Sequence, residues 1–230
     1  MRPGFSLAFA ILALWLIAAA PPQNFMALGI QCNSAEPDVA IKACTALLGL
    51  EQPSTAARAK ILVTRGEAYT AKRSFDPALK DFDQAIALNP GSATAFVERG
   101  NTYQSKGDFN RAIDDYSQAI KLDPNNEEAF SQRGSALGSV KQYGRAIQDF
   151  YQALRLHPGD PEILGNRGTA YVMIGQFALG IADLNQAIKG KPNDAILIYI
   201  RGIAKQQLGD SAGATSDLAQ AKKIDPKIGL

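Results

Sequence analysis

Residues 93–126 read ATAFVERGNTYQSKGDFNRAIDDYSQAIKLDPNN, and the same pattern returns every 34 positions along most of the 230-residue chain. Two markers make the repetition easy to follow, an Arg-Gly pair in the first half and a proline near the end. The pair occurs at Arg65-Gly66, Arg99-Gly100, Arg133-Gly134, Arg167-Gly168 and Arg201-Gly202, and the proline at Pro90, Pro124, Pro158, Pro192 and Pro226. Such a fixed period is typical of an array of identical supersecondary units rather than of one globular core.

Each unit is predicted to form two helices joined by a short polar turn. The first helix of each unit is expected to end near Ala71, Ser105, Ser139, Met173 and Gln207. The second is expected to run to the residue before the recurring proline, which cannot continue a helix. Ser92, and Asp160 followed by Pro161, supply the expected caps at helix starts.

Glycine inside a helix costs about 1 kcal/mol relative to alanine, so five glycines in one phase need a compensating reason. Close approach of the two helices is the simplest reason. We expect the second helix to approach Gly66 or Gly100 through Ala78 or Ala112, with the bulky residue four positions later filling the space beyond.

These residues resemble the tetratricopeptide repeat family over roughly residues 59–229. In the second unit the family's typical slots are all filled, by Gly100, Tyr103, Ala112, Tyr116, Ala119 and Pro124. The resemblance implies an all-α fold, a right-handed α-solenoid of antiparallel helix pairs whose first helices line a concave groove. Departures from the family pattern are Gly180 and Leu184 in the fourth unit and Lys205 and Ser211 in the fifth.

The resemblance also sets the expected boundaries of the units. They are residues 1–27 (signal peptide or N-terminal anchor), 28–58 (a partial helical unit with both cysteines), and the repeats 59–92, 93–126, 127–160, 161–194 and 195–228, the last of them atypical.

The first residues indicate export. Arg2 is followed by an uncharged, mostly apolar run over residues 5–20 that ends in three alanines. A positive start, a short apolar run and small residues are typical of a secretory signal, and the run is shorter than the roughly 20 residues that span a bilayer. We therefore expect a bacterial periplasmic protein. A retained anchor facing the periplasm is the alternative, and it would be the chain's only contact with a membrane.

Cys32 and Cys44 are the two cysteines of the chain. In an exported protein such a local pair indicates a disulfide. Two free, buried thiols are the alternative.

Every repeated arginine has an aspartate sixteen residues later, which predicts a structural Arg–Asp ladder, since a planar guanidinium suits a carboxylate at a helix seam. The pairs are Arg65 with Asp81, Arg99 with Asp115, Arg133 with Asp149, Arg167 with Asp183, and Arg201 with Asp217. The rival interpretation is a row of arginines that clamps a partner's carboxylate.

The resemblance implies that first-helix residues line the groove. Those expected to do so are Val63, Glu67, Thr70, Val97, Asn101, Gln104, Ser131, Ser135, Thr169, Val172 and Tyr199. Family members that bind acidic chaperone tails use a lysine and asparagine clamp. Val63 and Glu67 occupy two of its first positions here, so that function is not carried over. A groove without a specific ligand stays open as an alternative.

The first helix of the fifth unit begins with residues 195–200, AILIYI, which are apolar on every side. Such a helix is normally buried, and here no further helix is expected to cover it. Its residues form a candidate association surface: Ile196, Ile198, Tyr199, Ile200 and Ile203.

No pattern in the sequence indicates catalysis. His157 is the single histidine, and no Gly-rich phosphate-binding motif is present. The net charge of +2 is spread along the chain, which argues against a nucleic-acid partner. We therefore expect a protein without enzymatic activity, cofactor or metal, which binds a protein or peptide in its groove. Assembly into a homo-oligomer through the last unit is the second hypothesis.

Overall fold

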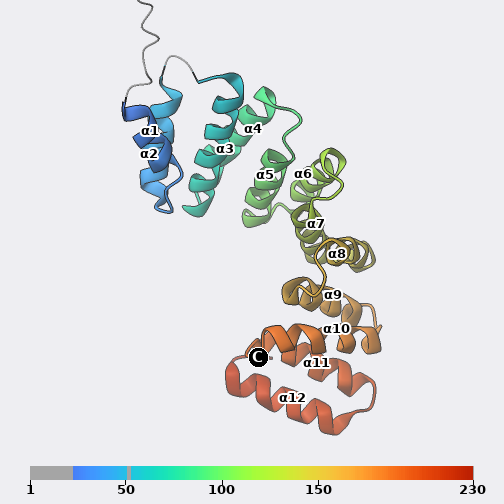
Figure 1. The fold of residues 1–230 in the computed structure, drawn as a ribbon. Coiled ribbons are helices and arrows are strands. Elements are labelled where there is room, and N and C mark those ends of the chain that lie inside the picture. The colour runs from blue at the N-terminus through green and yellow to red at the C-terminus, as the bar shows by residue number, and fades with distance from the viewer. Residues whose placement is uncertain (1–22, 51–52, 230) are drawn as a thin grey trace, which may run out of the picture.

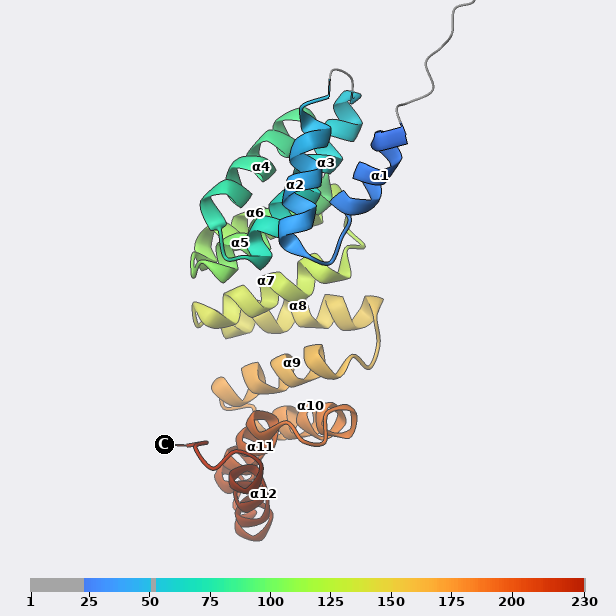
Figure 2. The ribbon, with the colours of Figure 1, turned by 90° about the vertical axis from the view of Figure 1, so that its left-hand side faces the viewer.

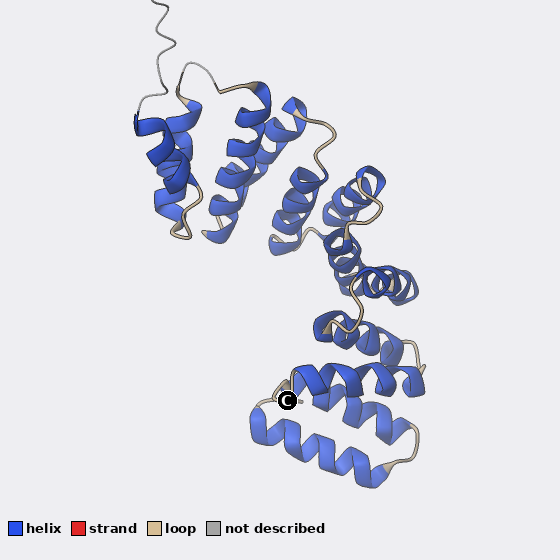
Figure 3. Cartoon of the chain, in the orientation of Figure 1, coloured by secondary structure: helices blue, strands red, loops and turns tan. Residues whose placement is uncertain are grey.

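A computed structural model describes residues 23–50 and 53–229. Within these residues the chain forms twelve α-helices and no strand (Figure 3), which confirms the predicted all-α class. None of the described helices combines the length and apolar character needed to cross a membrane.

The helices form six antiparallel pairs that stack one after another into a curved array (Figures 1 and 2). The pairs are α1 (Gln23–Cys32) with α2 (Pro37–Leu48), α3 (Thr55–Ala71) with α4 (Phe75–Leu88), α5 (Ala93–Ser105) with α6 (Phe109–Leu122), α7 (Glu127–Ser139) with α8 (Tyr143–Leu156), α9 (Pro161–Met173) with α10 (Phe177–Gly190), and α11 (Ala195–Gln207) with α12 (Ser211–Ile224).

The predicted ends of the first helices are confirmed, but the second helices end one residue earlier than predicted. α4 stops at Leu88, two residues before Pro90, and Asn89 is extended with φ −140° and ψ 84°. The reason is that proline pushes the residue before it out of the helical region.

The predicted caps of α5 and α9 are confirmed. The Ser92 hydroxyl accepts from the Ala95 amide, and the Asp160 carboxylate accepts from the amides of the second and third residues of α9. The first unit differs from the prediction, because α3 begins at Thr55, a turn before Ala59. The hydroxyl of Ser54 accepts from the Ala57 amide and caps this earlier start.

The curvature of the array follows from which helices touch. The first helices of neighbouring units contact one another, as in α3 with α5 and α7 with α9. Among the described residues the second helices, α4 to α12, make no such contacts with each other. The first helices therefore lie on the inner, concave side of the array.

Inside each unit the repeated glycine lies against the bulky residue of the second helix. A Cβ atom added to Gly66, Gly100 or Gly134 would lie 2.7 Å from the ring of the facing aromatic residue, respectively Phe82, Tyr116 and Phe150. The sequence predicts the close approach correctly, but it places the contact at Ala78 and Ala112. The ring itself is the neighbour, because it turns back over the glycine.

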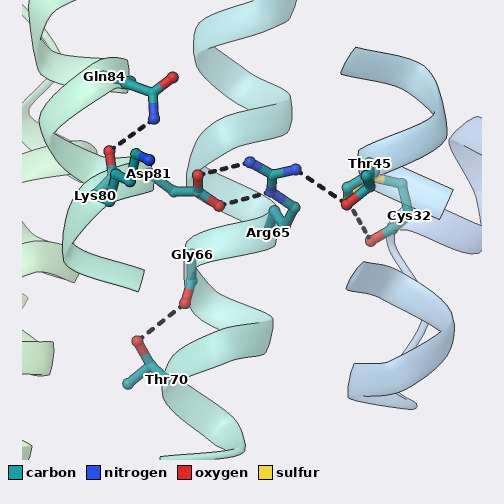
Figure 4. Close-up of polar contacts among 9 residues, drawn as sticks. Cys32, Thr45, Arg65, Gly66, Thr70, Lys80, Asp81 and Gln84 are labelled. Carbon is teal, nitrogen blue, oxygen red and sulfur yellow. Dashed lines mark hydrogen bonds and ion pairs between the residues drawn. A yellow bond between two sulfur atoms is a disulfide. The ribbon is translucent and has the colours of Figure 1, made fainter. Parts of the chain in front are cut away.

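Each of the five repeated arginines binds its aspartate through two hydrogen bonds. Arg65 donates from Nε and Nη2 to the two carboxylate oxygens of Asp81, at 2.7 Å each (Figure 4). The other four pairs have the same bidentate geometry, with distances of 2.7–2.9 Å. All five aspartates are buried. This geometry favours the structural ladder over the clamp for a partner's carboxylate.

Four of these arginines also reach back to the preceding pair through Nη1. The acceptor of Arg65 is the hydroxyl of Thr45 on α2 (Figure 4). Arg99, Arg133 and Arg201 donate in the same way to residues sixteen positions earlier, which are Asp83, Ser117 and Asn185. One guanidinium thus joins three helices, and it links neighbouring units as well as the two halves of its own.

A disulfide joins Cys32 at the end of α1 to Cys44 on α2. Both cysteines are buried, and with Leu47 they form the small core of the first pair. α1 begins at Gln23, so the boundary expected at residue 27 falls inside a helix. Residues 1–22, which hold the apolar run, lie outside the described residues.

Two glycines of α7 give a matched test of the ring contact. We expect Gly134→Ala to lower the free energy of unfolding by about 1–3 kcal/mol, because the new methyl group overlaps the Phe150 ring. In Gly138→Ala, in the same helix, the new methyl group meets no atom within 4 Å, and the free energy of unfolding should rise by about 0.5–1 kcal/mol. Urea denaturation followed by circular dichroism measures both, and equal effects would show that the contact does not limit the spacing.

Removing one arginine tests the ladder. Arg133→Met leaves the buried Asp149 carboxylate without its two donors and should cost about 2–4 kcal/mol of stability. The double variant Arg133→Met/Asp149→Leu removes the stranded charge and should recover much of the loss. Unchanged melting of the single variant would assign these arginines to partner binding instead.

Candidate functional site

The concave face is the candidate site, and the predicted groove residues fall into two groups. Val63, Thr70, Ser131, Ser135, Thr169 and Tyr199 are half-buried on first helices, as are Asn101 and Gln104, while Glu67 is exposed. The prediction that Val97 and Val172 line the groove is wrong. Their exposed fractions are only 2% and 8%, and both belong to the core between the helices. Val172 can turn inward because Gly180 has no Cβ. A Cβ at that position would lie 2.6 Å from Cγ2 of Val172.

The groove side of the second unit is closed by a polar network. The Tyr116 hydroxyl donates its one proton to Oδ1 of Asn101 at 2.8 Å, and Oε1 of Gln104 lies 3.4 Å away as a second, weaker acceptor. The ring of Tyr116 is fully buried, so these two side chains supply the partners that its hydroxyl needs. Asn101 and Gln104 therefore have a structural role, in addition to the predicted one of lining the groove.

Three glutamates from successive first helices meet around Asn101. The Asn101 amide donates to Oε2 of Glu98 at 3.3 Å and to Oε1 of Glu128 at 3.4 Å. Burial, together with the charges of Glu67 and Glu128, raises the pKa of Glu98 to about 7. Glu67 is accessible to solvent, yet partial desolvation by its neighbours, together with the Glu128 charge, also raises its pKa. Three acidic side chains thus lie close together in this part of the groove, and their mutual repulsion favours proton binding at Glu98.

Three cavities open between neighbouring first helices. The largest of them, about 410 Å³, lies between α7 and α9, and its lining includes Ser135, Gly138, Phe150 and Met173. A cavity of about 370 Å³ lies between α9 and α11, and Thr169 lines both. A third, of about 300 Å³ between α3 and α5, is lined by Val63 and Glu67. Small residues on the inner helices leave this space, Ser135 and Gly138 in the first of these cavities, Gly165 in the second and Ala56 and Ala59 in the third.

The candidate association surface on α11 is smaller than the sequence predicts. The prediction that Ile198 belongs to an exposed surface is wrong, since its side chain is fully buried. Ile200 packs against the core that includes Leu197 and Leu184. Tyr199 and Ile203 are half-buried, whereas Ile196 is 62% exposed. α11 packs against α9, α10 and α12. Of the five predicted residues, Ile196 is the most exposed, and it lies in the lining of the α9–α11 cavity.

Sequence reasoning missed Glu98 and Glu128 as groove residues. Glu128 stands in the first turn of α7, where an acidic residue is favoured by the helix dipole and needs no further explanation. The signal that could have found it is its spacing of three from Ser131, which places both on one face of the helix. Among the described residues no group of histidine, cysteine, aspartate and glutamate side chains could hold a metal ion.

Three tetratricopeptide repeat models match the sequence, over residues 59–92, 100–140 and 131–195. Together they cover more than half of the chain. No curated protein matches it.

Solved structures with the same fold include YrrB, described as a TPR protein with an unusual peptide-binding site. It aligns with a TM-score of 0.70 and 21% identity over 82% of this chain and 95% of its own. MamA aligns with a TM-score of 0.67 and 22% identity, over 75% and 96%. MamA from Desulfovibrio magneticus RS-1 gives 0.69 and 20%, over 75% and 98%. At these identities the likeness shows the fold alone.

The raised pKa of Glu98 predicts a pH-dependent stability. Its carboxyl group loses its proton near pH 4.5 in the unfolded chain and near pH 7 in the folded one. The folded state therefore binds more protons between these values, and stability falls as the pH rises through them, by about 3 kcal/mol. Glu98→Gln should remove this fall, so that the variant matches the wild type at pH 4 and exceeds it at pH 8. Urea denaturation at the two pH values measures the difference, and a variant no more stable than wild type at pH 8 would contradict it.

Proposed function

This chain belongs to the tetratricopeptide repeat family, and we propose that it is a scaffold that binds a segment of another protein in its concave groove. Proteins of this family bind protein or peptide partners and are typically non-catalytic. The chain's role would then be to hold its partner.

The observation that carries this proposal is the row of hollows along the inner helices. The cavities between α3 and α5, α7 and α9, and α9 and α11 all open between first helices and are lined by predicted groove residues such as Ser135 and Thr169. A groove with repeated pockets can hold successive side chains of one bound segment.

We propose further that the scaffold works outside the cytoplasm, in the bacterial periplasm or anchored at the periplasmic face of the inner membrane. The charged start, apolar run and alanines of residues 1–20 support export, and the Cys32–Cys44 disulfide fits an oxidising compartment. Cleavage near Ala20 would leave α1 whole, whereas cleavage at residue 27 would remove part of it. Fractionation of cells that express the tagged chain tests this placement.

A homo-oligomer that assembles through the last unit is the alternative. The exposed side chain of Ile196 is the observation that favours it. Light scattering separates the two hypotheses: a dimer that dissociates on Ile196→Lys supports assembly, while a monomer of unchanged mass supports a groove-binding scaffold.

Site-specific photo-cross-linking in the native cell tests the groove directly. A photoreactive residue at Ser135, on the concave face, should form covalent adducts with another protein. The same residue at Gln148, exposed on α8 of the same unit, is the matched control and should form few. Equal cross-linking at both positions, or none at Ser135, would count against binding in the groove.

A further inference from the structure

The third unit differs from the second in how its buried ring is covered. In the second unit Asn101 and Gln104 cover Tyr116 and bond its hydroxyl. The equivalent positions in the third unit are Ser135 and Gly138.

The ring beneath them is Phe150, which has no hydroxyl to satisfy. Small residues in the cover therefore leave the hollow of about 410 Å³ between α7 and α9. Tyr143, Ala170 and Met173 complete an apolar lining, and the rim carries the polar groups of Asn166 and Thr169. A Cβ on Gly138 would meet no atom within 4 Å, so this side of the hollow is open. The shape and lining suit one bulky apolar side chain.

The opposite end of α7 carries negative charge. Glu128 stands in its first turn, and its carboxylate shares the Asn101 amide with Glu98, while Glu67 approaches from α3. The ion pairs formed by described residues involve other acids, so none of the three has a cationic partner. A cation from a bound molecule would relieve the repulsion among three nearby carboxylates.

The hollow and the charge lie at opposite ends of α7, so the length of this helix sets their separation along its axis. Glu128 and Gly138 are ten residues apart on one helix, which corresponds to about 15 Å at 1.5 Å per residue. An extended segment spans about 15 Å in four or five residues. A short segment is not helical by itself in water, so binding in the extended form requires less ordering.

We propose that the bound partner is an extended protein segment carrying a bulky apolar side chain and a lysine or arginine four or five residues apart. The apolar side chain enters the hollow beside Gly138, and the cation lies against Glu98 and Glu128. This inference rests on the proposed groove function and specifies its ligand class.

Selection of a random dodecapeptide display library on the purified protein, with the Cys32–Cys44 disulfide intact, tests the proposal. The enriched peptides should pair a basic residue with Phe, Leu, Met or Trp at the stated separation. Fluorescence anisotropy with one enriched peptide, labelled with fluorescein, then measures affinity. Its binding should weaken as salt is added, because the ion pairs are screened.

Two variants assign the two contacts. Gly138→Leu fills the hollow, and it should weaken binding by about tenfold or more, the equivalent of losing one buried apolar side chain. Gly144→Leu, at an equally open glycine of α8 outside the groove, is its control. Glu98→Gln/Glu128→Gln should weaken binding several-fold and reduce the salt dependence. Glu36→Gln, an exposed acid on the loop before α2, is the control for charge.

The outcomes separate this inference from the groove function. Enriched peptides that are acidic, that lack either side chain, or that bind both variants as well as wild type would overturn the inference. If such peptides still block cross-linking at Ser135, the groove function itself stands. Failure to enrich any peptide would overturn both.

Discussion

The contact between a helical glycine and the bulky side chain beneath it sets the distance between the two helices in each of the five repeats from α3–α4 to α11–α12, and the other regular bonds depend on that distance. Arg65 directly precedes Gly66, and Asp81 directly precedes Phe82, so the ion pair and the ring contact are neighbours on the same two helices. A wider spacing would move the guanidinium out of reach of the carboxylate. One steric condition thus brings both an apolar and a charged contact into place, unit after unit.

The same condition leaves the inner face free to vary. The ring and the carboxylate come from the second helix, whereas the groove residues come from the first helix, in the turn after the glycine, and lie over the tip of the ring. Polar side chains can therefore cover the ring, as Asn101 and Gln104 do, or small ones can leave it open, as Ser135 and Gly138 do. The helices of the two units have the same lengths, 13 residues for α5 and α7 and 14 residues for α6 and α8. Recognition can change along the array without a change of fold.

The sequence predicts the helix pairs and their order because the pattern of apolar, small and proline residues repeats with one period. It also predicts which arginine meets which aspartate, since that spacing never varies. It fails where a side chain turns away from the direction that its slot implies. Val97 and Val172 occupy groove slots but pack inward, and Ile198 is covered by its own neighbours. The acidic surface escaped notice because Glu67, Glu98 and Glu128 come from three units at three different slots and meet only in the folded array.

The reach of each arginine has a consequence for how such a chain changes in evolution. A guanidinium bonds sixteen residues forward within its unit and, at Arg99, Arg133 and Arg201, sixteen residues back into the one before. A gene duplication could insert one more 34-residue unit. The arginine of the new unit would find its aspartate sixteen residues later in the same unit, and it would lie beside the second helix of the preceding unit. The array could lengthen or shorten by whole units with every seam intact.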